Sequence, residues 1–184
     1  MTEWHARYGG RGVMIYWHVD RKSACIYSQL KRCSSSEVAA MVEGVLRHCT
    51  DATVERQYTD SHGQSEVAFA FCKLLGFDLL PRLKAIHSQR LYRPDNSVSY
   101  PALAPVLSRT IDWELIAQQY DQMVKYTTAC ESERRTPKTS SAASIKPTFS
   151  TRFTALAELG KAGKTIFLCR YLHSMSCGAR PMRG

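Results

Sequence analysis

Two stretches near the start of the chain alternate bulky and polar side chains in the way that β-strands do. In residues 12–19 β-forming side chains recur at close spacing, and a polar turn, Asp20-Arg21-Lys22, follows them. Residues 23–30 form a second run of the same kind. Because two such runs joined by a short polar turn are typical of a hairpin, the pattern predicts a β-hairpin over residues 12–30.

The next part of the chain predicts helices and strands in alternation. Residues 34–49 have an apolar stripe at helical spacing behind serines that can cap a helix. Residues 54–58 are typical of a strand that leads to Asp60, residues 64–75 of a helix that Gly76 ends, and residues 77–80 of a short strand broken at Pro81. The order strand–strand–helix–strand–helix–strand predicts an α/β fold.

The C-terminal half is predicted to be mostly helical, with one interruption. Residues 111–128 carry a clear helical stripe, and a second stripe begins at about Ala155 and ends after Ser174. Between them, Ser and Thr supply nine of the 24 residues from 130 to 153 and no periodicity survives, which favours disorder. We therefore divide the chain into a core over 1–95, a connector and helix over 96–129, a disordered segment over 130–154, and a helix with an irregular tail over 155–184.

Composition limits the class of protein. A chain of 184 residues can bury one core, and its net charge of +9 with a pI near 9.3 suits a polyanionic partner, although an inert basic surface has the same composition. Seven cysteines without a CxxC pair favour reduced thiols over a disulfide framework or a zinc site. No apolar run reaches membrane-spanning length and no signal peptide is visible, so we expect a cytoplasmic protein with no membrane partner.

Asp60 is the best-placed candidate for chemistry. It follows a predicted strand, and a helix opens just behind it after the turn marked by Ser61 and Gly63. A carboxylate at that position can hold a cation at the mouth of an α/β sheet. It can equally cap the helix, and the spacing alone does not decide between the two roles.

The stretch YTDSHGQSEVAFAFCKLLGFDLLPRLKAIHSQRLYRPD resembles the region around the second catalytic aspartate of the transposases of the Tn-three family. Four further blocks resemble neighbouring parts of the same family: RYGGRGVMIYWHVD, SACIYSQL, IDWELIAQQYDQMVKYTTA and ALAELGKAGKTIFLCRYL. Together these blocks cover most of residues 7–129 and 155–173. The resemblance implies a DDE enzyme of replicative transposons, a metal-dependent enzyme that cleaves and joins DNA at transposon ends, acts as an oligomer, and has an RNase H-like core.

The resemblance also implies the site. A DDE enzyme uses three carboxylates, two Asp and one Glu, to hold two Mg²⁺ or Mn²⁺ ions. Asp60 matches the second Asp, as catalytic residue and metal ligand, whereas the chain shows no match for the first Asp or the final Glu. We expect cations in the same block to contact DNA phosphates, although a solvated edge is the alternative; these are Arg82, Lys84, Arg90 and Arg93.

Residues 130–154 have a second interpretation. Back-translated with suitable codons and read one nucleotide earlier, they can give LRVGTADAEDILRRFNQTNVQHPIY, which resembles the helical block that the family has here. Residues 177–184 shifted in the same way can give LRRETHEG. The hypothesis is an out-of-frame segment in an incomplete transposase. We expect a transposase fragment that is inactive by itself; the alternatives are a non-catalytic basic DNA-binding remnant and a pseudogene product.

Overall fold

The computed structural model describes residues 2–5, 9–35, 37–48, 53–132 and 149–176. The chain divides into two compact units, unit 1 from Met1 to Val54 and unit 2 from Glu55 to Gly184. The boundary falls inside the region 1–95 that the sequence groups into one core.

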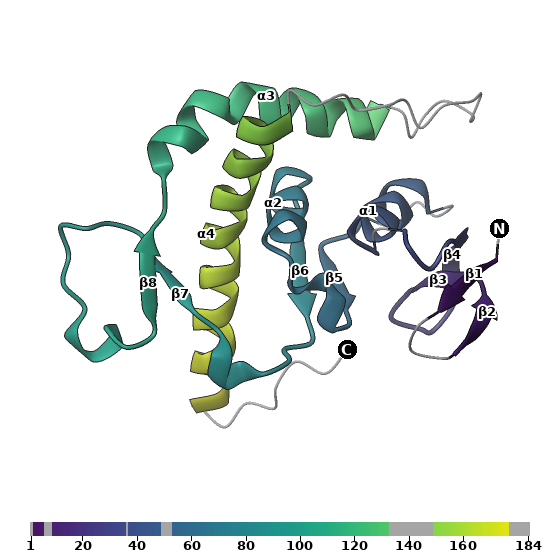
Figure 1. Ribbon diagram of the computed structural model, residues 1–184, viewed down its shortest axis with the longest axis horizontal. Coiled ribbons are helices and arrows are strands. Elements are labelled where there is room, and N and C mark those ends of the chain that lie inside the picture. The colour runs from purple at the N-terminus through teal and green to yellow at the C-terminus, as the bar shows by residue number, and fades with distance from the viewer. Residues whose placement is uncertain (1, 6–8, 36, 49–52, 133–148, 177–184) are drawn as a thin grey trace. The chain divides into compact units, whose positions relative to one another are not determined.

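Unit 1 consists of two antiparallel hairpins and one helix, all of which can be followed in Figure 1. Its elements are β1 (Glu3–His5), β2 (Gly10–Gly12), β3 (Met14–Val19), β4 (Cys25–Lys31) and α1 (Glu37–Arg47). The Asp20 carboxylate closes the β3–β4 turn by accepting hydrogen bonds of 2.8 Å from the backbone N–H groups of Lys22 and Ala24. The predicted hairpin and helix are confirmed. The β1–β2 hairpin lies in residues that showed no strand pattern.

Helix α1 packs on the β3–β4 hairpin through a close approach at Gly44. The buried imidazole of His18 lies so near that a Cβ atom at Gly44 would be 1.8 Å from His18 Nε2. The Gln29 side chain spans the same interface and donates a 2.5 Å hydrogen bond to the carbonyl oxygen of Ala40. Position 44 therefore has room for glycine alone.

Unit 2 begins with a strand–helix–strand motif. β5 (Arg56–Thr59) and β6 (Asp78–Pro81) are parallel, and the 3₁₀ turn η1 (Ser61–Gln64) and helix α2 (Glu66–Leu74) connect them. Gly76, at φ +84°, ends α2 in a Schellman motif, because its N–H bonds to the carbonyl of Lys73 and the N–H of Phe77 to that of Cys72. The predicted strand, helix, glycine stop and second strand are confirmed.

The rest of unit 2 is a second small sheet and two long helices. Its elements are η2 (Ile86–Ser88), β7 (Leu91–Arg93), η3 (Pro101–Leu103), β8 (Leu107–Thr110), α3 (Trp113–Ser132) and α4 (Phe149–Ser176). β7 and β8 are parallel neighbours, so the predicted connector contains a strand, β8, that the sequence analysis did not predict. Most of the segment 130–154 lies outside the described residues, but helix enters it from both sides, to Ser132 in α3 and from Phe149 in α4.

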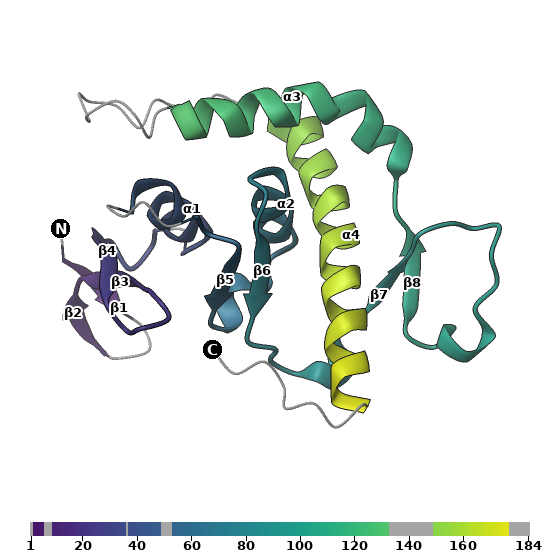
Figure 2. The same cartoon turned by 180° about the vertical axis from the view of Figure 1, so that it is seen from behind.

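Helix α4 lies beside α2, as both views show (Figures 1 and 2), and it supplies part of the core of unit 2. The buried cluster draws on α2, α3 and α4 and the residue after β8; its members are Ala70, Ile111, Ile116, Met123, Ala155 and Leu156. A Cβ atom at Gly160 of α4 would lie 1.7 Å from the backbone oxygen of Glu66, so glycine sets the distance between α4 and α2.

The mixed helices and small sheets fit the predicted α/β class, but an RNase H-like core is not confirmed. The described strands form four sheets of two strands each instead of one continuous sheet. None of the described helices is long and apolar enough to cross a membrane.

Candidate active site

Asp60 lies at the carboxyl end of the β5–β6 pair. The parallel register sets Thr59 opposite Pro81, and one residue further the N–H of Arg82 donates a 2.8 Å hydrogen bond to the carbonyl oxygen of Thr59. The residues that leave the two strands, Asp60 and Arg82, are therefore at the same edge. Ligands of open α/β sheets bind at this edge, beyond the carboxyl ends of parallel strands.

The turn after Asp60 is held tightly against β5. The N–H of Gly63 donates a 3.2 Å hydrogen bond to the carbonyl oxygen of Asp60. A Cβ atom at Gly63 would lie 2.0 Å from the Oγ1 atom of Thr59, so any larger residue would push the turn away from the strand. Asp60 itself is exposed, and the side chain of His62 lies outside the described residues.

Asp60 is the candidate metal ligand at this edge. Among the described residues, no group of three or more His, Cys, Asp or Glu side chains comes close enough to hold a metal ion. A two-ion centre needs several carboxylates around both ions. Asp60 and its described neighbours therefore do not fit such a centre without further acids.

A basic segment follows β6 and folds back onto the turn after Asp60. Residues 82–90 hold three of the four predicted DNA-contacting cations, and Arg82, Lys84 and Arg90 are all exposed. Arg93 differs from them, because it is half-buried in β7 and pairs with Thr110 in the neighbouring strand. The structure thus brings Arg82 to the edge where Asp60 lies and sets Arg93 in a different sheet.

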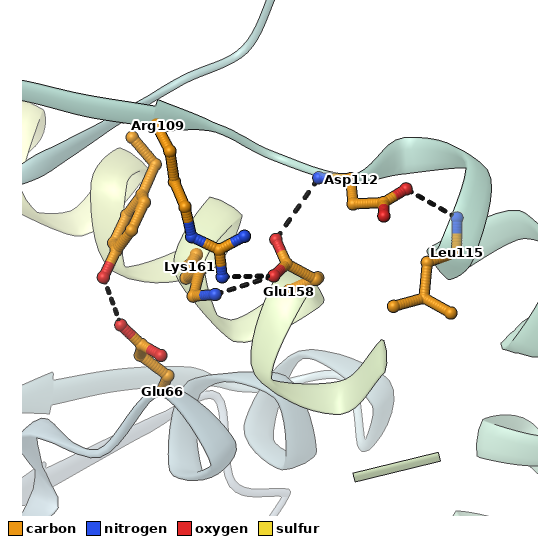
Figure 3. A network of polar contacts seen from close by, with 7 residues as sticks. Glu66, Arg109, Asp112, Leu115, Glu158 and Lys161 are labelled. Atoms are coloured by element: carbon orange, nitrogen blue, oxygen red, sulfur yellow. Dashed lines mark hydrogen bonds and ion pairs between the residues drawn. The ribbon is translucent and has the colours of Figure 1, made fainter. Parts of the chain in front are cut away.

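A buried ionic network lies between α4 and the β8–α3 connection. Glu158 Oε1 is 2.7 Å from both Arg109 Nη2 and Lys161 Nζ, and its Oε2 accepts a 3.2 Å hydrogen bond from the N–H of Asp112 (Figure 3). Glu158 and Lys161 are buried, whereas Arg109 is mostly exposed. Burial alone would raise the pKa of Glu158, but these hydrogen bonds and charges hold that pKa below its ordinary value.

A second polar contact links β7 to the first residue of α2. The Tyr92 hydroxyl donates a 2.5 Å hydrogen bond to Glu66 Oε1, and Lys161 Nζ lies 5.5 Å from the centre of the Tyr92 ring. Burial, together with the neighbouring Glu66 carboxylate, raises the pKa of Tyr92 to about 12. Helix α2, which starts behind Asp60, is thus tied to β7 and α4 through polar groups.

Comparison with known proteins decides the family. Residues 1–179 match the family model described as the Tn3 transposase DDE domain. The chain belongs to this family. The transposase of transposon Tn1546 from Enterococcus faecium is 28% identical over 178 residues, which cover 95% of this chain and 18% of that protein. The transposase of Tn501 from Pseudomonas aeruginosa is 26% identical over 183 residues, covering 97% and 18%.

The chain spans about a fifth of the length of the curated relatives it matches. The transposase of transposon gamma-delta from Escherichia coli strain K12 is 23% identical over 171 residues, 16% of its length. No solved structure matches the chain. The resemblance stated from the motif around Asp60 is therefore confirmed at the level of the family.

Sequence reasoning missed the side chains that make the polar contacts of unit 2. The Glu158–Lys161 pair has the three-residue spacing of a helical ion pair, which is a visible signal. Its burial depends on Arg109 and Asp112, which are far away in the sequence. Gln64, in the turn after Asp60, and Gln89, within the basic segment, carried no signal at all.

Proposed function

We propose that this chain is the part of a Tn3-family DDE transposase that carries the second catalytic aspartate, Asp60, and that meets the DNA backbone through the residues after β6. One observation supports both parts of the proposal: parallel β5 and β6 deliver an acid and a cation, Asp60 and Arg82, to the same sheet edge. A carboxylate there can ligate a divalent ion while cations beside it neutralise the phosphates of the strand to be cut.

Catalysis by this set requires partners. In the complete enzyme, Asp60 would share Mg²⁺ or Mn²⁺ with the other two acids of the family's triad, and an oligomer would bring two transposon ends together. The 184 residues by themselves contribute one matched acid. We therefore expect the isolated chain neither to nick transposon ends nor to join strands, with either metal ion.

DNA binding by the isolated chain is the second candidate function, favoured by the exposed cations of residues 82–90. It should be independent of sequence and steeply reduced by salt, because backbone contacts release counterions. Each phosphate contact contributes about −0.9 to the slope of log K against log salt concentration. In a variant in which Arg82, Lys84 and Arg90 are all alanine, the magnitude of this slope should therefore fall by about 2.7.

The test measures binding of the chain to a random duplex by fluorescence anisotropy at several salt concentrations. The matched control replaces Lys73 of α2 and Lys125 of α3, which are exposed cations outside the segment. An equal loss of slope per charge removed in both variants would show that the segment has no special role. Strand transfer that Asp60→Ala abolishes in the isolated chain would show that the acids needed are already present.

A further inference from the structure

The basic segment, residues 82–90, carries exposed cations and contains no acid of its own. The sequence from Leu79 to Pro94 contains no Asp or Glu. Within the described part of the chain, the side chains of Arg82, Lys84 and Arg90 make no ion pair. Exposed cations that pair with no carboxylate fit a polyanionic partner better than they fit a structural role.

The basic segment nevertheless has a defined backbone. Ala85 adopts φ 51° and ψ 56°, a left-handed conformation that costs a non-glycine residue about 1–2 kcal/mol. Its carbonyl oxygen accepts hydrogen bonds from both the N–H and the Oγ of Ser88, at 2.9 and 2.8 Å. A strained conformation persists only where surrounding contacts impose it, so further contacts must hold the segment in place.

The side chains of two glutamines make those contacts. Gln64 Nε2 donates a 2.9 Å hydrogen bond to the carbonyl oxygen of Arg82. Gln89 Nε2 lies 3.1 Å from Gln64 Oε1 and 3.0 Å from the carbonyl oxygen of Lys84. Gln64 is the last residue of η1, the turn that starts directly after Asp60. The backbone of two cationic residues is thereby fastened to the turn that carries the candidate catalytic acid.

We propose that Gln64 and Gln89 form a latch that holds the basic segment against the Asp60 turn, so that Arg82, Lys84 and Arg90 meet DNA phosphates as a preformed set. The inference rests on the proposed function. Both glutamines are positioning residues, because they act on the backbone that carries the cations. A preformed set loses less conformational entropy on binding than a loose loop does, so opening the latch should weaken DNA binding without removing any charge.

The first experiment compares the intact chain with Gln64→Ala, Gln89→Ala and the double variant in binding to a random duplex over a range of salt. We expect each single variant to weaken binding at low salt about 3- to 10-fold and to lower the salt slope by about 1, the share of one phosphate. The double variant should be little worse than either single one, because the two side chains share a hydrogen bond. Gln118→Ala, which alters an exposed glutamine on α3, is the matched control and should bind as the unchanged chain does.

The second experiment is limited trypsin digestion of the folded variants without DNA. The latch variants should be cut after Lys84 at least several-fold faster than the unchanged chain or Gln118→Ala, with the same thermal midpoint. If the latch variants keep the original salt slope and trypsin rate, the proposed latch is wrong. The proposed function nevertheless survives that result if Arg82→Ala, Lys84→Ala or Arg90→Ala still lowers the salt slope. If neutralising the three cations changes nothing, the latch and the DNA-contacting part of the proposed function both fail.

Discussion

Removing the Glu158 carboxylate should be among the most damaging single changes to unit 2. The Glu158 side chain is 2% exposed and that of its partner Lys161 8%, whereas the Arg109 side chain is 61% exposed and can turn to water. Glu158→Ala therefore leaves one buried ammonium group without a partner and the N–H of Asp112 without an acceptor. Breaking a buried pair by removing one partner costs about 3–5 kcal/mol, and we expect a loss in that range.

The assay is urea unfolding followed by the fluorescence of Trp113, which lies at the start of α3 next to this network. Trp113 Nε1 donates a 2.7 Å hydrogen bond to the carbonyl oxygen of Pro94, so its emission reports the local fold. Trp4 and Trp17 belong to unit 1, and replacing both by Phe leaves Trp113 as the sole tryptophan of the three.

The control removes the whole pair. Glu158→Leu combined with Lys161→Met leaves no buried charge, and swaps of this kind are often neutral or stabilising. The double variant should therefore be more stable than Glu158→Ala. A loss below about 1 kcal/mol for Glu158→Ala would refute the reasoning, because it would mean that Lys161 reaches water or another partner.

Three further predictions follow from packing and titration. Gly160→Ala forces a Cβ atom against the Glu66 backbone and should lower the free energy of unfolding of unit 2 by about 1–3 kcal/mol. Gly163→Ala is the control: its Cβ atom would lie 3.5 Å from the nearest atom, so it should be neutral or stabilising in the same urea unfolding. Burial lowers the pKa of His18, so the stabilisation of unit 1 by neutral His18 should be complete above the ordinary pKa of an imidazole and should be lost as the pH falls below it. His18→Leu should remove that pH dependence in thermal unfolding measured over a series of pH values. Because the pKa of Glu158 is lowered when folded, unit 2 should lose stability as pH falls below the ordinary carboxylate value, and Glu158→Gln should flatten the urea midpoint against pH.

Local periodicity predicted the elements that are long enough to repeat their apolar side chains several times. The β3–β4 hairpin, α1, α2 and α3 each repeat apolar side chains at the spacing of their type, and Gly76 marks a real helix end. The β1–β2 hairpin and the β7–β8 pair consist of strands of three or four residues, too short for alternation to be visible. Each of these strands depends on its partner strand, and the spacing of nearby residues does not indicate which distant residues will pair.

The candidate site also has features that the sequence indicates and contacts that only the fold shows. The position of Asp60 at the end of a strand was predictable, because a strand, a glycine turn and a helix are successive in the chain. The contact between Gln64 and Gln89 joins residues 25 positions apart, and the Glu158–Arg109 pair joins residues 49 apart. Neither pair has a periodic pattern, so only the fold reveals them.

The most direct measurement of the central claim uses a family transposase in which residues 54–95 of this chain replace the matching segment. DNA cleavage at transposon ends is measured for a chimera that retains it, then for Asp60→Asn and for Asp78→Asn, which changes an exposed acid in β6. If Asp60 is the second metal-binding acid, Asp60→Asn should abolish cleavage while end binding persists, and Asp78→Asn should cleave normally. Cleavage that survives Asp60→Asn at the original rate would contradict the assignment of Asp60.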